Sequence, residues 1–206
     1  MRDIDDFLTE VLVYAPNLNE PLAHRVIRDA ARDLCFKARL WRERDSIQID
    51  DPTYEGICTI QDADIVEIEQ AKFNGVNLTP VTKRWLDGFN CDWQNSEVSS
   101  GAAQYVTQLN PNTVTVYPFA EGTLELGLIL QPSLTATTMP DWLLDLHRGL
   151  IGQGAAARAL LLPGENSNPT LGAGLQSIFE SKVASAKTQS VKGQQGARLR
   201  TKGDYF

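Results

Sequence analysis

The chain has 206 residues, of which 42% are hydrophobic and 22% charged, and its formal net charge is −7. This length and composition predict a globular protein with its own core and exclude a largely disordered chain. An apolar run of about 18 residues is missing and the chain begins with the acidic stretch MRDIDDFLTE, so we expect a soluble protein with neither a membrane span nor a secretory leader.

The first 44 residues carry two helical patterns. Over residues 3–14, apolar side chains recur at steps of three and four, and the acids at positions 3, 5 and 6 suit the positive end of a helix. Asn19 followed by Pro21 predicts the start of a second helix. From Leu22 to Trp41 the apolar residues keep helical spacing, so we expect the two helices to pack as a hairpin.

After Arg44 the period changes to two, which indicates strands. Asn74-Gly75 is typical of a tight hairpin, and residues 105–117 predict two strands around a turn. Alternating leucines from 124 to 130 predict a further strand, and the short connections favour an antiparallel sheet. Residues 84–101 predict a loop, in which Trp85 and Trp93 either cap a small core or contact another protein.

Helical spacing returns at Pro140. The apolar face expected for this helix comprises Leu143, Leu146, Leu150, Gly154, Ala157 and Leu161. Small residues between 149 and 157 would let another helix approach closely, at some cost in intrinsic helix stability. After a loop at 163–169, a last helix is predicted to about Lys187 from Leu171, Leu175, Ile178, Phe179 and Val183. Beyond Thr188 the chain holds too few apolar residues to form a core, and we expect this tail to be disordered alone.

Helices at both ends of a strand-rich middle predict an α+β protein. We expect residues 1–44 to form an N-terminal helical hairpin and residues 140–188 the C-terminal helices of the same bundle. Residues 45–139 are predicted to be an antiparallel β insertion, and residues 189–206 an extended C-terminal tail.

The sequence lacks the motifs that carry common chemistry. It contains no GxGxxG, GxxxxGK[ST], HExxH or GxSxG. Glu20 and His24 have helical i,i+4 spacing but supply two ligands where zinc needs three or four. Cys35, Cys58 and Cys91 are odd in number and form no CxxC pair, which argues against a disulfide framework or a zinc knuckle. We therefore expect no catalytic residue, no cofactor and no metal site.

Charge is divided unevenly along the chain. Residues 182–206 hold six basic side chains and one acidic one, which leaves about −12 for the remainder. Between Asp45 and Asp145 there are fifteen acidic residues and only three basic ones, Lys72, Lys83 and Arg84. Because this stretch would repel phosphate groups, direct DNA binding by the middle of the chain is not expected.

Two sets of residues suggest protein contacts. The second helix carries an arginine stripe, Arg25, Arg28, Arg32 and Arg39, which either is a solvated face balanced by Asp29 and Asp33 or meets the acidic middle of a neighbouring copy in a ring-closing subunit interface. The tail combines spaced cations with closing aromatics, namely Lys192, Arg198, Arg200, Lys202, Tyr205 and Phe206. It suits a strand that orders on an acidic, grooved partner; the alternatives are a purification remnant and a solubilising tail.

The order and spacing of the first 45 residues resemble the start of head-to-tail adaptor proteins of tailed phages. The residues that carry this resemblance are Phe7-Leu8, Val11-Leu12, Tyr14-Ala15-Pro16-Asn17, Pro21, Arg28-Asp29-Ala30-Ala31-Arg32-Asp33-Leu34-Cys35 and Trp41-Arg42-Glu43. The later hairpin with Gly75, Leu78 and Pro80 is similar in layout. The resemblance implies a non-enzymatic virion protein that forms a dodecameric homo-oligomeric ring below the portal protein, with a tail or nozzle protein beneath it.

This family also implies a central channel through which DNA passes without specific binding, and a C-terminal extension that docks into the portal. An acidic channel wall would keep phosphates off the surface. The protein would be made in the cytoplasm of the bacterial host and reside at the head-to-tail junction of the virion, with no membrane contact. The alternatives are another small tail-completion protein and a hydrolase with unfamiliar site geometry.

Overall fold

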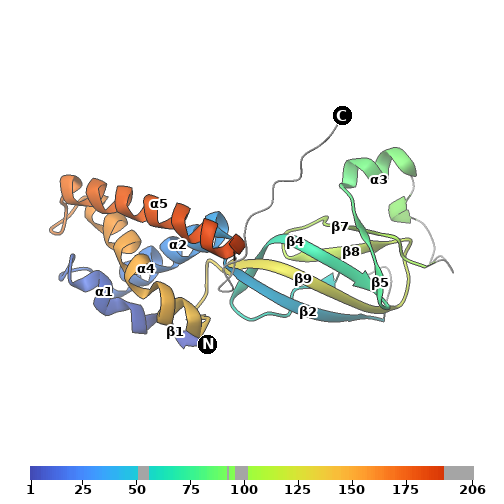
Figure 1. Ribbon diagram of the computed structural model, residues 1–206, viewed down its shortest axis with the longest axis horizontal. Helices are drawn as coiled ribbons and strands as arrows, with labels where there is room; N and C mark the ends of the chain where they lie inside the picture. Colours follow the sequence, from blue (N-terminus) through green and yellow to red (C-terminus); the bar gives the residue numbers. More distant parts are fainter. Residues whose placement is uncertain (51–55, 92, 96–101, 193–206) are drawn as a thin grey trace. The chain divides into compact units, whose positions relative to one another are not determined.

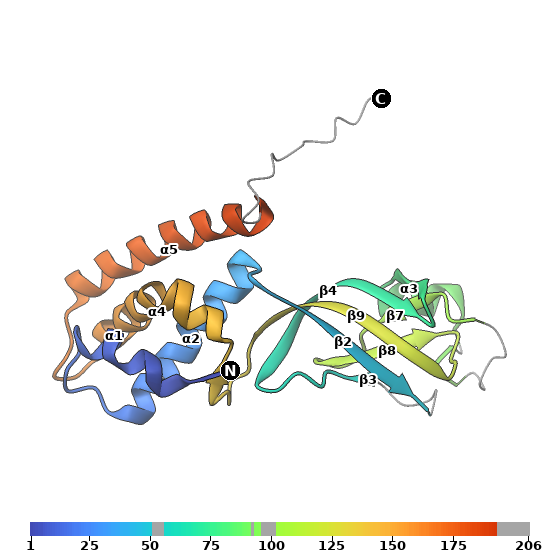
Figure 2. The same ribbon diagram turned by 60° about the horizontal axis from the view of Figure 1, so that its bottom comes forward.

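The computed structural model describes residues 1–50, 56–91, 93–95 and 102–192 (Figures 1 and 2). The chain divides into two compact units. A helical unit combines Met1–Leu40 with the chain from Pro132 onward, and a strand-rich unit comprises Trp41–Gln131. Helices and mainly antiparallel strands make this a mixed α+β protein, which confirms the predicted fold class.

The helical unit is built from short N-terminal elements and three longer helices. Their bounds are β1 Arg2–Asp3, η1 Ile4–Phe7 (a 3₁₀ helix), α1 Leu8–Leu12, α2 Glu20–Ala38, β10 Thr138–Met139, α4 Asp141–Leu161 and α5 Pro169–Lys192. β1 pairs antiparallel with β10. Asn19 caps α2, because its side-chain oxygen accepts a hydrogen bond from the Leu22 N–H at 3.1 Å. The predicted N-terminal helices are therefore present, the first of them beginning as a 3₁₀ turn.

Helix α4 is the centre of this unit, since α1, α2 and α5 all pack against it. Small residues make these approaches possible. A Cβ atom on Gly152 would lie 2.3 Å from the Cβ of Glu10, and one on Gly154 would lie 2.6 Å from the ring of Phe179. The predicted small-residue contact is thus present, and the cost of glycine in a helix is offset by close packing.

Arg158 of α4 joins three helices. Its guanidinium forms an ion pair with Asp33 of α2, donates to the carbonyl oxygen of Gly154 at 2.8 Å and lies 5.3 Å from the centroid of the Phe179 ring in α5. The Arg158 side chain is only 21% exposed, so this interaction is screened less than a surface pair.

The strand-rich unit contains two four-stranded sheets. Their strands are β2 Trp41–Ile49, β3 Gly56–Ile57, β4 Ala63–Phe73, β5 Val76–Asn77, β6 Thr79–Pro80, β7 Tyr105–Thr107, β8 Thr113–Tyr117 and β9 Gly122–Pro132. The strand orders are β2-β9-β4-β5 and β3-β8-β7-β6. β2 and β9 pair in register from Trp41 opposite Leu130 to Ile49 opposite Gly122. The four leucines at even positions of β9 are all buried, as their alternation predicted.

Turns and one buried carboxylate join the two sheets. Leu78 N–H donates to the carbonyl of Ala71, and the chain then passes from β5 into β6. At the other edge, buried Asp45 of β2 accepts hydrogen bonds from the backbone and hydroxyl of Thr59, at 3.0 and 2.7 Å. The buried charge of Asp45 is therefore hydrogen-bonded, as burial requires.

The Asn-Gly hairpin between β4 and β5 is confirmed. Asn74 and Gly75 have φ values of 48° and 81°, the left-handed conformations that such a turn requires. The turn between β7 and β8 likewise places Asn112 at φ 62°, and its side-chain oxygen accepts from the Ile65 N–H of β4 at 2.7 Å.

The second helix is shorter than its apolar pattern indicated. α2 ends at Ala38, and the next residue, Arg39, is left-handed with φ 53°. Trp41, predicted on the helix, instead opens β2 and is 2% exposed. A left-handed residue stops a helix. Trp41 is apolar, and an apolar residue suits both a helix face and the first inward position of a strand. The spacing of apolar residues alone therefore did not distinguish helix from strand at this position.

The segment predicted as a loop contains a helix, α3 Lys83–Phe89, and a 3₁₀ turn, η2 Trp93–Asn95. Thr82 caps α3 by accepting a hydrogen bond from the Trp85 N–H at 3.2 Å. Trp93 is fully buried, donates its indole N–H to Asp87 at 2.8 Å and packs in a cluster with Leu86. Of the two predicted roles, Trp93 caps a small core, whereas Trp85 is 44% exposed.

The apolar faces of α4 and α5 also differ from the prediction. Leu146 and Leu161 are 63% and 48% exposed, because the buried face of α4 is formed mainly by residues 151–160. In α5, Leu171 and Ile178 are exposed while the other three predicted residues are buried. The helix continues to Lys192, five residues beyond the predicted end.

Substitution of Gly154 tests the packing of α4 against α5. Gly154→Ala should lower the free energy of unfolding by about 1–3 kcal/mol, because its methyl group would overlap the Phe179 ring. Gly149→Ala in the same helix is the matched control: nothing lies within 4 Å of its added Cβ, so stability should rise by about 0.5–1 kcal/mol. Urea unfolding measures both. Equal effects at the two positions would contradict the packing described.

Candidate functional site

His147 is not part of a catalytic cluster in the described chain. The ring of His147 is about half-buried and stands edge-on to Trp142, with centroids 6.1 Å apart. Burial lowers the pKa of His147, which favours the neutral imidazole. Within the residues that the structure describes, no hydrogen bond or ion pair joins His147 to an acid or a cysteine. The described residues therefore include no group that would orient His147 for general-base catalysis.

Cys58 lies near several acidic side chains. Their negative charge disfavours the thiolate form that a cysteine nucleophile requires. Burial raises the pKa of the Cys58 thiol, a hydrogen bond with the Ile60 backbone lowers it in part, and the carboxylates of Asp45, Asp64 and Glu43 raise it further. The thiol is thus held in its protonated, weakly nucleophilic form.

The structure adds an acid to the predicted Glu20–His24 pair. The Nε2 atom of His24 lies 2.6 Å from Oδ1 of Asp5 in η1 and 4.0 Å from Oε1 of Glu20. The i,i+4 spacing identified Glu20 but not Asp5, which is nineteen residues from His24 in sequence. Both carboxylates are exposed, and the contact holds η1 against α2.

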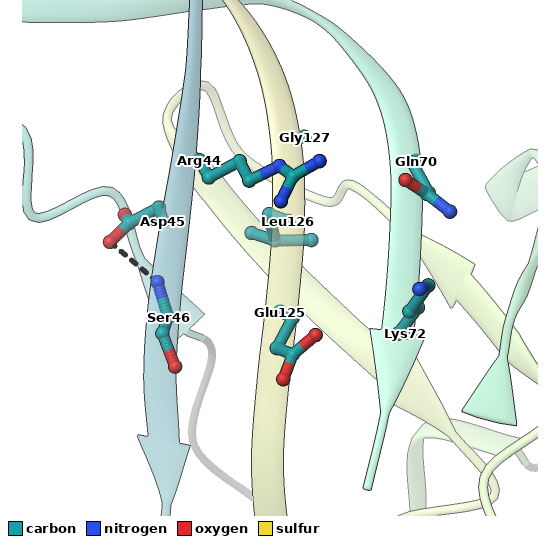
Figure 3. A pocket seen from close by; sticks show the side chains of 8 residues that line it. All are labelled: Arg44, Asp45, Ser46, Gln70, Lys72, Glu125, Leu126 and Gly127. Carbon is teal, nitrogen blue, oxygen red and sulfur yellow. Dashed lines mark hydrogen bonds between the residues drawn. The ribbon is translucent and has the colours of Figure 1, made fainter. Parts of the chain in front are cut away.

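A polar depression lies on the outer face of the sheet formed by β2, β9 and β4 (Figure 3). Its volume is about 330 Å³, and its lining includes Gly127 of β9. Because glycine has no side chain, the space beside Gly127 is open up to Gln70, which a Cβ atom at this position would meet. Arg44 reaches from β2 across β9, with Lys72 and Glu125 lower on the same face. This is a solvated surface of mixed charge, and its lining contains neither histidine nor cysteine.

The four predicted interface arginines do not form one free stripe. Nη1 of Arg28 donates to the Ala136 carbonyl at 3.1 Å, and Nη1 of Arg32 donates to the Pro132 carbonyl. Arg25 is exposed on α2. Arg39, also exposed, is the left-handed residue that ends the helix. The carbonyl acceptors lie 100 or more residues away, so helical spacing alone did not identify them.

Of the predicted tail residues, the described chain contains Lys192 alone. It is exposed at the end of α5, whereas Arg198, Arg200, Lys202, Tyr205 and Phe206 lie outside the described residues. Near this end, the Ser190 hydroxyl donates to the Arg39 carbonyl at 3.1 Å, which holds the last turn of α5 beside the end of α2.

Three aromatic side chains gather on α3 and β7. The ring centroids of Trp85 and Phe89 are 5.1 Å apart with a 9° interplanar angle, and the centroid of Tyr105 lies 5.0 Å from that of Trp85. Phe89 is 62% exposed. We call these three residues, with Lys83 and Arg84 of the same helix, the α3 patch. Thr82 and the i,i+4 spacing of Trp85 and Phe89 were the sequence signals for it.

The described chain thus combines a helical unit and a strand-rich unit with exposed aromatic and charged side chains. The chain belongs to the SU10 adaptor protein family, whose family model matches residues 2–202. This is a family of phage head-to-tail adaptors, as the resemblance predicted, so the protein is a structural component of the virion that associates with portal and tail proteins.

Comparison with curated proteins gave no match. Among the described helices, none combines the length and the apolar character needed to span a membrane.

The three thiols should differ in reactivity. Cys91 is exposed and should be alkylated first, whereas Cys58 should react more slowly because its pKa is raised. Burial raises the pKa of Cys35 to about 12, so this thiol should react only after unfolding. Mass spectrometry after timed treatment with iodoacetamide at pH 8, with and without urea, measures each site. Native-state labelling of Cys35 at the rate of Cys91 would contradict the burial described.

Proposed function

We propose that this adaptor assembles into a ring of twelve copies between the portal and the tail, with DNA passing through its centre. The observation that carries the proposal is the family match over residues 2–202. The ring and its copy number follow from the family resemblance. The exposed aromatic and basic side chains of the α3 patch, which suit contacts with other proteins, support the proposal.

The charge distribution suits a DNA conduit. Glu125 is exposed on the strand-rich unit, and the stretch from Asp45 to Asp145 carries fifteen acids against three basic residues. Acids that face the channel would repel phosphate groups and so let DNA pass without specific binding. We place the channel-facing acids between Asp45 and Glu125, in the insertion.

The basic tail is proposed to dock into the portal protein. Its first cation, Lys192, stands at the end of α5, whose last turn is held by the Ser190–Arg39 hydrogen bond. The chain beyond it would thus start from a fixed point and order on an acidic groove, with Tyr205 and Phe206 as apolar anchors.

The helical unit is proposed to contact neighbouring copies through the arginines of α2. Arg25 is the member of the stripe best placed for this role, since it is exposed on the helix. Arg28 and Arg32 already bind carbonyl oxygens of their own chain. The protein is proposed to be made in the cytoplasm of the bacterial host before it joins the virion.

Removal of the tail tests portal docking. A chain that stops after Lys192 keeps α5 intact and should keep its thermal stability, yet it should lose most of its binding to the portal ring in electron microscopy of the mixture. A chain that stops after Thr188 is the comparison, because it also loses Ser190 and its hydrogen bond. Unchanged portal occupancy by the chain ending at Lys192 would show that residues 193–206 are only a remnant or a solubilising tail.

Charge reversal at Arg25 tests the subunit contact. Arg25→Glu should weaken assembly about 10-fold at low salt and less at high salt, because salt screens an interfacial charge pair. Sedimentation on the portal ring measures this effect. Lys37→Glu on the same helix is the control, since Lys37 lies 3.8 Å from Asp33 of its own chain. Assembly of Arg25→Glu at the wild-type level would remove Arg25 from the interface.

A further inference from the structure

The α3 patch combines exposed aromatic area with unpaired positive charge. Trp85 and Phe89 are 44% and 62% exposed, although Leu86, which lies between them in the sequence of α3, is completely buried. Lys83 and Arg84 are both exposed, and neither forms an ion pair or hydrogen bond among the residues that the structure describes. The one acid of α3, Asp87, accepts the hydrogen bond of the buried Trp93 indole.

Such a combination is typical of a protein contact. Trp, Tyr and Arg are the residues most often found at the energetic centre of interfaces, and contiguous exposed aromatics are unusual on a surface that only meets water. The partner should be acidic, because the patch carries two positive charges. The chain's own tail is basic and would be repelled.

Nucleic acid is a less suitable occupant of the patch. Aromatic and basic residues do bind single strands, but a nucleic-acid site needs a cationic groove that follows the backbone. Between Asp45 and Asp145 the only other basic residue is Lys72, against fifteen acids. The surroundings of the patch would therefore repel a phosphate backbone beyond the two cations of α3.

A complementary acidic surface exists on the same unit. Asp50 follows β2 and Glu121 precedes β9, immediately beyond the last paired residues of the two strands, Ile49 and Gly122. Asp50 and Glu121 therefore lie at the same end of the β2–β9 ladder. Both are exposed, and within the described part of the chain neither has an ion pair or a hydrogen bond.

The two surfaces lie on opposite sides of the strand-rich unit. α3 connects β6 to β7 in one sheet, whereas β2 and β9 lie in the other, and the two views place α3 and the end of β2 on opposite sides (Figures 1 and 2). A contact between these surfaces within one copy is thus prevented. Complementary surfaces on opposite sides of a subunit are the requirement for head-to-tail association into a ring.

We propose that the α3 patch of one copy docks onto the Asp50–Glu121 pair of the neighbouring copy. Lys83 and Arg84 meet the two carboxylates, and Trp85 and Phe89 are covered by the end of the β2–β9 ladder. This inference rests on the proposed ring. It adds a subunit contact that the strand-rich insertion makes itself.

Paired charge reversals test this contact. The full chain is studied by sedimentation velocity, alone over a range of concentrations and mixed with its portal ring. Lys83→Glu with Arg84→Glu should weaken association between copies at least about 10-fold, and Asp50→Lys with Glu121→Lys should do the same. An equimolar mixture of the two variants should recover association, since each variant then presents charges that complement the other.

Three further measurements decide the outcome. Glu165→Lys with Glu180→Lys reverses two exposed acids elsewhere and should assemble as the wild type does. Trp85→Ala with Phe89→Ala should also weaken association, and thermal unfolding verifies that each variant is folded. A mixture that fails to recover, charge variants that assemble normally, or a wild type that never self-associates would overturn the inference. A wild type that self-associates through this contact but ignores the portal would overturn only the proposed function.

Discussion

Pairing between β2 and β9 is the constraint on which this architecture depends. An insertion of some ninety residues can interrupt a helical bundle only if its two ends are close together, because otherwise the helices before and after it are forced apart. Trp41 and Leu130 are paired across the ladder, so the chain leaves and returns at neighbouring points. Arg28 and Arg32 then hold the returning segment by hydrogen bonds from α2 to its carbonyl oxygens. These arginines satisfy backbone groups that a junction between a sheet and a helix would otherwise leave unpaired.

Local signals were sufficient to predict most of the fold. Asn74-Gly75, the Asn19 cap and the alternating leucines of β9 each determine backbone conformation from a few adjacent residues. The prediction was wrong where tertiary packing decides. Trp41 suits a helix face and an inward strand position equally, and Arg39 has no sequence mark of its left-handed conformation. Leu146 fits the spacing of a buried face, yet α4 turns its alanines and glycines inward because only small residues allow its neighbours so close.

The surfaces were harder to predict than the fold. A helical periodicity places four arginines near one another, but it contains no information about acceptors a hundred or more residues away. The α3 patch was missed for the opposite reason: a polar segment rich in Gly, Asn and Asp predicted a loop, and only its capping threonine and the i,i+4 spacing of two aromatic residues indicated a helix. The arginines that helical spacing assigned to one surface of α2 are thus partly used inside the molecule, whereas Lys83 and Arg84 of α3 are exposed and form no ion pair among the described residues. In an adaptor, whose role depends on contacts with other proteins, this redistribution determines which faces are available.

The Ser190–Arg39 hydrogen bond joins two places that are far apart in sequence. Arg39 is the left-handed residue that follows α2, and Ser190 lies in the last turn of α5. This hydrogen bond fastens the last turn of α5 to the residue that follows α2, so the position of Lys192, where α5 ends, depends on α2 as well as on α5.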